Sequence, residues 1–139
     1  MGPIQTVFLV NEASEAALLQ SFRAGRLYAL SRTPAYALAL QEFTVRQGDA
    51  EAISGGTLQA SRNRPLEVRV RLAATDGREY AVRAVLVRNG EVAQVWAGKT
   101  PLDVVHREPF RGAPSYYRLD VHGPVPHQLL TNPIFVREG

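Results

Sequence analysis

The stretch between Leu66 and Leu72 constrains the fold of this chain more than any other. Four apolar residues alternate there with three charged ones, in the order LEVRVRL. Successive side chains of a β-strand point to opposite faces, so a period of two predicts a strand with one face on a core and the other in water. The sequence therefore favours a sheet with one buried and one solvated face.

Seven further stretches after residue 25 also predict strands, and turns that contain Gly or Pro separate them. The strongest hairpin signal is Asn89-Gly90, because both turn residues must tolerate a positive φ. Near Gln41 the apolar parity changes within a stretch, which indicates a bulge or a break. Strands of this length and spacing indicate a mainly β fold, an immunoglobulin-like β-sandwich. The eight predicted strands are 27–31, 36–45, 66–72, 82–87, 91–97, 102–106, 116–122 and 134–136, whereas 47–56 is predicted to be a loop.

The first 25 residues carry a different pattern. Ile4–Val10 predicts a short strand, and Asn11 can cap a following helix because its side-chain oxygen accepts from an otherwise unpaired backbone N–H. Apolar residues at a spacing of three predict one N-terminal α-helix over residues 12–24. The chain therefore divides into a connecting strand and helix, residues 1–25, and a β-sandwich domain, residues 26–139.

Composition excludes several classes of function. A chain of 139 residues fits one domain, and the absence of cysteine excludes disulfides and thiolate sites. The net charge is +3, and the basic residues form no dense cluster, so nucleic-acid binding is not expected. No signal peptide is visible, and no window approaches the ~20 apolar residues of a membrane span. We expect a soluble chain and assign it no compartment.

The histidines are the first candidates for chemistry. His106 and His122 could lie on neighbouring strands, with Asp120 on the same face as His122. No pair of histidines has the close spacing of a typical metal motif, and an ion needs ligands that converge within ~2–2.6 Å. We therefore expect surface histidines, with no metal, no cofactor and no catalytic residue in this chain. His106 and His122 remain candidate ligand residues.

Aromatic residues are the second group of candidates. Trp96, Tyr116 and Tyr117 could form a stacking platform for sugars, but the same residues suit the core and rim of a sandwich equally well. Trp96 and Tyr116 are kept as candidate ligand or interface residues, whereas Tyr117 is interpreted as structural. The glycine-rich segment 54–56 lacks the Lys-Ser/Thr of a phosphate-binding loop and is interpreted as a connection between strands.

Four motifs in a fixed order carry a family resemblance. They resemble the C-terminal accessory domain that follows the metal-binding barrel in phosphoesterases of the PHP (polymerase and histidinol phosphatase) family. In that domain a helix ends in a Gly-Arg pair, a β-sandwich follows, and the chain closes on a Thr-Asn-Pro-Ile strand. The matching segments are Leu18–Tyr28, which contains Gly25-Arg26, Val85–Val92, Tyr116–Val121 and Thr131–Val136.

The resemblance implies a non-catalytic part of a larger metal-dependent phosphoesterase, with the upstream catalytic barrel as its partner. The metal ligands of that family include a His-x-His pair, which this chain lacks, so no ligand position can be carried over. The apolar face of the helix at 12–24 is then one expected docking surface. Two alternatives stay open: a β-sandwich that binds carbohydrate or another ligand, and a free-standing enzyme with an unrecognised site.

Overall fold

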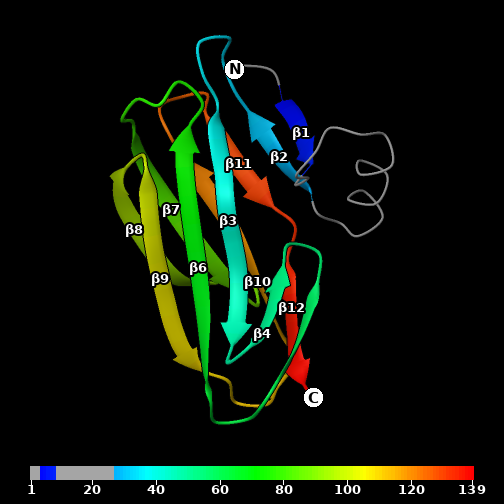
Figure 1. The fold of residues 1–139 in the computed structure, drawn as a ribbon. Helices are drawn as coiled ribbons and strands as arrows, with labels where there is room; N and C mark the ends of the chain where they lie inside the picture. The colour runs from blue at the N-terminus through cyan, green and yellow to red at the C-terminus, as the bar shows by residue number, and fades with distance from the viewer. Residues whose placement is uncertain (1–3, 9–26) are drawn as a thin grey trace.

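The computed structural model of the chain describes residues 4–8 and 27–139, with side chains from residue 29 onward, and these residues form strands in two sheets (Figure 1). The helix predicted over residues 12–24 lies outside the described residues. No membrane-spanning helix occurs in the described part of the chain. The strands are β1 Ile4–Phe8, β2 Leu27–Ser31, β3 Leu38–Gln47, β4 Ala50–Ile53, β5 Thr57–Ala60, β6 Pro65–Ala74, β7 Ala81–Arg88, β8 Glu91–Lys99, β9 Leu102–Pro109, β10 Ser115–His122, β11 Gln128–Thr131 and β12 Ile134–Glu138.

Strand β10 organises the larger of the two sheets, which has eight strands. Along one edge it pairs with β7, which in turn pairs with β8. Its other edge is divided, because β12 pairs with the first half of β10 and β11 with the second half. The sheet continues from β11 to β2 and β1, and from β12 to β5, its parallel neighbour.

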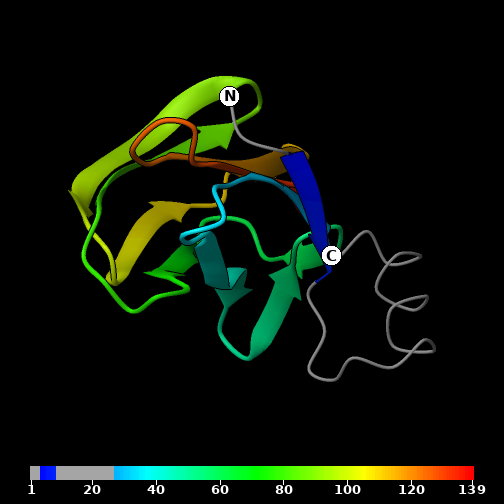
Figure 2. The same ribbon diagram turned by 90° about the horizontal axis from the view of Figure 1, so that it is seen from above.

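The smaller sheet contains four antiparallel strands in the order β4-β3-β6-β9. Seen from above, it forms a second layer against the large sheet (Figure 2). The fold is therefore all-β and sandwich-like within the described residues, as the sequence predicts.

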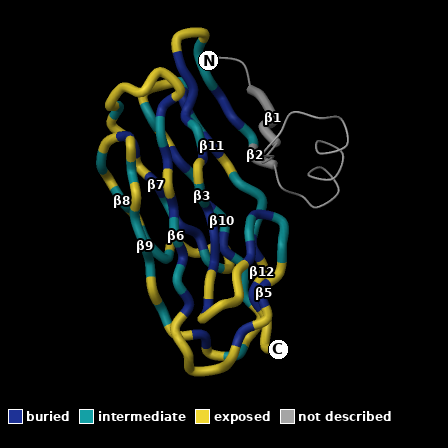
Figure 3. The backbone as a smooth tube through the Cα atoms, in the orientation of Figure 1, coloured by how far each residue is buried: buried dark blue, intermediate teal, exposed yellow. Residues whose placement is uncertain are grey.

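The core lies between the two layers, where the buried residues of both sheets meet (Figure 3). The alternation in β6 is confirmed, since all four of its predicted inward residues are almost fully buried. Each such side chain contributes about 1.5–3 kcal/mol by leaving water. The residues that pack into this layer include Leu66, Val68, Val70, Leu72, Leu86, Leu119, Val121, Leu129 and Ile134.

Local signals for turns and bulges are also confirmed. Asn89 and Gly90 have φ of 53° and 81°, and they join β7 to β8 as the hairpin signal predicts. The register of β3 against β6 shifts between Leu40 and Glu42, at the position where the parity of the sequence changes. Pro133 directly precedes β12, where its missing N–H costs no ladder hydrogen bond.

The predicted number of strands is wrong. Eleven strands, not eight, lie between residues 27 and 139, and the three missed ones are β4, β5 and β11. Each is four residues long, which is too short for a period of two to be distinctive. They form because longer neighbours offer edges to pair with. The segment 47–56, expected as a loop, therefore contains β4.

Candidate functional site

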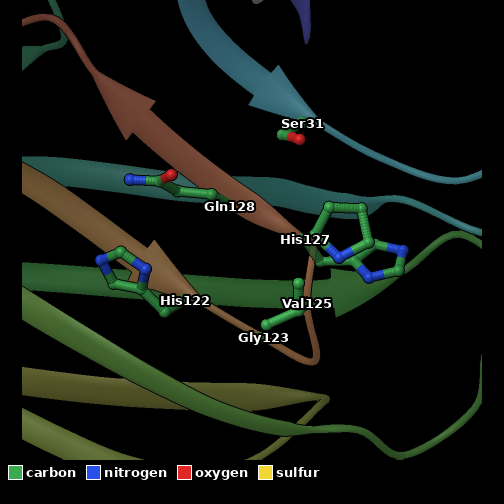
Figure 4. Close-up of a pocket in the computed structure, with 7 residues that line it drawn as sticks. Ser31, His122, Gly123, Val125, His127 and Gln128 are labelled. Carbon is green, nitrogen blue, oxygen red and sulfur yellow. The ribbon is translucent and has the colours of Figure 1, made fainter. Parts of the chain in front are cut away.

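A cavity of about 410 Å³ opens where strands β2, β10 and β11 meet the loop that joins β10 to β11 (Figure 4). Two of its walls differ in character, since the strands contribute polar side chains and the loop contributes an apolar tip. Its lining consists of Ser31, His122, Gly123, Val125, Pro126, His127 and Gln128.

The polar wall is a row of three residues on neighbouring strands. Gln128 lies directly opposite Ser31 on one side and His122 on the other. The carboxylate of Asp120 holds two of them: its Oδ1 lies 3.0 Å from His122 Nε2 and accepts from Gln128 Nε2 at 3.4 Å. The row therefore has a defined orientation before any ligand binds.

The opposite wall is fixed by the His127 ring. Nδ1 lies 2.7 Å from the carbonyl oxygen of Pro124, and Nε2 lies 3.2 Å from both the Thr33 hydroxyl and the carbonyl oxygen of Tyr36, so polar contacts hold the ring at both nitrogens. The ring stacks on Tyr36 at a centroid distance of 3.8 Å, and Tyr36 stacks on Tyr80 at 3.7 Å. Three loops at this end of the sandwich are thus tied together by one column of rings.

Two buried hydroxyls beside this column have no hydrogen-bond partner within the described part of the chain. They are Ser31 Oγ, which belongs to the cavity wall, and Tyr36 Oη. Burial, and secondarily the charge of Asp76, raises the pKa of Tyr36. A buried hydroxyl without a partner costs stability, which marks both positions as unusual.

A second polar cluster joins the two sheets at a different place. Glu108 of β9 accepts hydrogen bonds from Tyr117 and Arg88 of the large sheet, and its Oε2 lies 3.2 Å from His106 Nε2. Burial acts to raise the pKa of Glu108, but the hydrogen bonds from Tyr117, Arg88 and His106 outweigh it and hold that pKa below its usual value. Burial, followed by the bond to Glu108, raises the pKa of Tyr117. A cavity of about 190 Å³ adjoins this cluster. The polar groups of the cluster largely use their hydrogen-bonding capacity on one another.

The structure separates the two candidate histidines. His106 lies on β9 of the small sheet and His122 on β10 of the large sheet, so the prediction that they occupy neighbouring strands is wrong. The expectation that Asp120 shares a face with His122 is confirmed by their contact. Among residues 4–8 and 27–139, no group of three or more His, Asp or Glu side chains is placed to hold a metal ion.

The candidate aromatics are separated as well. Trp96 lies opposite the buried Ala84 and packs against the core. Tyr116 lies opposite the exposed Phe135, and the centroids of their two rings are 6.5 Å apart. They therefore occupy opposite faces of the large sheet and form no shared platform. Tyr117 is 1% exposed and belongs to the core, in keeping with its structural interpretation.

Sequence reasoning missed Ser31 and Gln128. Neither residue belongs to a motif, and only the pairing of β2 with β11 brings them together. The segment Gly123–His127 has one signal in the sequence, its high proline content, which indicates a turn but no site.

No protein-family model matches the chain, and no curated protein matches it. The functional assignment therefore rests on the motifs of the sequence and on the geometry of the described residues.

Proposed function

We propose that this chain is a non-catalytic accessory β-sandwich of a metal-dependent phosphoesterase of the PHP family, where it supports the catalytic barrel of the parent protein. In this proposal the sandwich is of the immunoglobulin-like class. The motif resemblance suggests the family, and one structural observation favours a supporting role over a chemical one.

That observation concerns the closing motif, whose residues are engaged in holding the sandwich together. Ser54 Oγ donates to the carbonyl oxygen of Asn132 at 2.8 Å, and the N–H of Gly55 donates to the carbonyl oxygen of Pro133 at 2.9 Å. The N–H of Phe135 in turn donates to the carbonyl oxygen of Gly56 at 2.9 Å. The loop 54–56 and the closing motif therefore form one hydrogen-bonded unit, as suits a structural connection.

Two further residues, one in the closing motif and one in the loop 54–56, have structural roles. Thr131 Oγ1 accepts from the backbone N–H of Leu119 at 2.9 Å, which ties β11 to β10. Gly56 cannot carry a side chain without strain, because a Cβ there would lie 3.0 Å from the carbonyl oxygen of Ile53. Side chains and backbone that serve the fold in this way suggest that the motif identifies a place in a larger architecture and not a reactive centre.

The proposal is tested by assaying the pure chain against p-nitrophenyl phosphate and bis-p-nitrophenyl phosphate with added Mn²⁺, Zn²⁺ or Mg²⁺. We expect no turnover above a buffer blank, with a known alkaline phosphatase as the positive control. Hydrolysis that co-purifies with the folded chain and is abolished by a chelator would overturn the non-catalytic role.

The proposed identity of the parent enzyme is tested separately, by determining what the reading frame upstream of Pro3 encodes. We expect it to encode a barrel rich in His, Asp and Glu ligands, and we expect that barrel, expressed separately, to bind this chain in size-exclusion chromatography. A frame without such a barrel would refute the PHP assignment.

A further inference from the structure

The cavity beside Ser31 has the features of a ligand site, and none of them is needed for an accessory role. Its polar wall consists of Ser31, Gln128 and His122, directly opposite one another on three adjacent strands. Two strand spacings place the ends of this row roughly 10 Å apart. That is the width of one sugar ring with its substituents.

The hydrogen-bonding capacity of the row suits hydroxyl groups. A serine hydroxyl and a primary amide each donate and accept, as a sugar hydroxyl does. Asp120 engages Gln128 through its amide nitrogen and His122 through Nε2, which leaves the Gln128 carbonyl oxygen and His122 Nδ1 available to a ligand. The wall thus offers alternating donors and acceptors at fixed positions.

Ser31 supplies the second, independent observation. The residue is only 8% exposed and its Oγ has no hydrogen-bond partner in the described part of the chain, although it lies in the cavity wall. A buried hydroxyl in that state costs about 1–3 kcal/mol. The Oγ is itself buried, so a ligand hydroxyl placed against this wall would provide the missing partner once the Ser31 side chain turns toward the cavity.

The loop wall is both apolar and preorganised. Val125 is 95% exposed at its tip, and Pro126 lies next to it in the lining. The loop is closed on itself, because the N–H of Gly123 donates to His127 O at 3.0 Å and the N–H of His127 donates to Pro124 O at 2.8 Å. A wall that is ordered before binding costs little entropy when a ligand arrives. Its apolar surface fits the C–H face of a sugar ring.

The charges of the site argue against an anion. Asp120 places a carboxylate directly behind His122 and Gln128, within 3.0 Å and 3.4 Å of them. Arg83 lies opposite His122 on β7, but it does not belong to the residues that line the cavity. A phosphate or carboxylate in the cavity would face the Asp120 charge, whereas a neutral polyol would not.

We propose that the cavity between the β10–β11 loop and the row Ser31, Gln128 and His122 binds a neutral carbohydrate residue. The ligand's hydroxyl groups bond to the row, and its C–H face lies on Val125 and Pro126. This site is distinct from the Trp96 and Tyr116 platform considered from the sequence.

The test is a titration of the ¹⁵N-labelled chain, followed by NMR, with the methyl glycosides of glucose, galactose and mannose at millimolar concentration. Inorganic phosphate and methyl glucuronate are titrated in parallel as charged probes. We expect saturable shifts for at least one neutral glycoside, confined to the backbone amides of the cavity wall, which are those of Ser31, His122, Gly123, Val125, His127 and Gln128. Absence of saturable binding by every neutral glycoside, or tighter binding of either anion, would overturn the proposal.

Variants assign the binding to the row. Gln128→Ala and Ser31→Ala should each weaken binding about tenfold, the effect of losing one hydrogen bond to a ligand. Gln94→Ala on β8, which removes the same amide outside the cavity, is the matched control and should leave affinity unchanged. Equal affinity in Gln128→Ala and the parent chain would place the ligand elsewhere. Far-UV circular dichroism of each variant confirms that the fold is retained.

Discussion

Two buried tyrosines should respond with opposite sign to the same substitution. Tyr36 is 6% exposed and Tyr117 is 1% exposed, so each phenol lies in the interior. The Tyr117 hydroxyl donates a hydrogen bond to the carboxylate of Glu108, whereas the Tyr36 hydroxyl has no hydrogen-bond partner within the described residues. Replacement by Phe removes one oxygen in each case and keeps the ring.

The expected free energies follow from these environments. Tyr117→Phe removes a hydrogen bond to a charged group and should destabilise the fold by about 1.5–3 kcal/mol. Tyr36→Phe removes an unpaired buried hydroxyl and should stabilise it by about 1 kcal/mol, while the stacking of the ring on His127 and Tyr80 is kept. At about 4 °C per kcal/mol, the melting temperatures should move in opposite directions.

Urea denaturation measures both changes. The fluorescence of Trp96, the only tryptophan, and far-UV circular dichroism report the same transition if unfolding is two-state. The slope of the free energy against urea should be equal in all three proteins, so that the midpoints compare stability alone. We expect Tyr36→Phe to raise the free energy of unfolding. A decrease of more than about 0.5 kcal/mol would refute the assignment of an unsatisfied hydroxyl.

Two further substitutions probe other contacts. Ser54→Ala removes the hydrogen bond to Asn132 in a fully buried position and should lower the free energy of unfolding in urea by about 1 kcal/mol. The control is Ser115→Ala, which removes an exposed hydrogen bond and should lower that free energy by less than about 0.5 kcal/mol. Equal losses in the two variants would argue against the hydrogen-bonded unit. Glu108 has a lowered pKa in the folded state, so its contribution to stability is complete above the ordinary glutamic acid pKa and is lost as pH falls through the folded value. Urea midpoints measured from pH 7 to pH 3 should therefore fall less steeply in Glu108→Gln than in the parent chain. The exposed Glu91→Gln is the control for loss of one negative charge, and identical pH profiles for all three proteins would contradict the assignment.

Much of the fold follows from local signals. The alternation in β6, the Asn89-Gly90 hairpin and the shift of parity near Gln41 each depend on residues close together in the chain. Such signals report which face of a strand is buried and where the chain turns, because side-chain direction and backbone φ are local properties. They therefore predict the all-β character correctly.

The candidate cavity could not be predicted in the same way. Ser31 and Gln128 are far apart in the chain and become opposite residues only when β2 pairs with β11. Tyr117 and Glu108 are only nine residues apart in the chain, but they lie on different sheets and meet because those sheets pack face to face. Side chains that gather through register and packing leave no pattern in any short window of sequence.

The sequence by itself determined the class of this fold, the inward face of its longest regular strand and the position of its main hairpin. Tertiary structure decided the order of strands, the existence of the four-residue strands β4, β5 and β11, and the separation of His106 from His122. The physical reason is that the preference of a residue for burial or for a turn depends on that residue and its immediate neighbours in the chain. The choice of neighbour depends instead on the free energy of the whole assembled sheet.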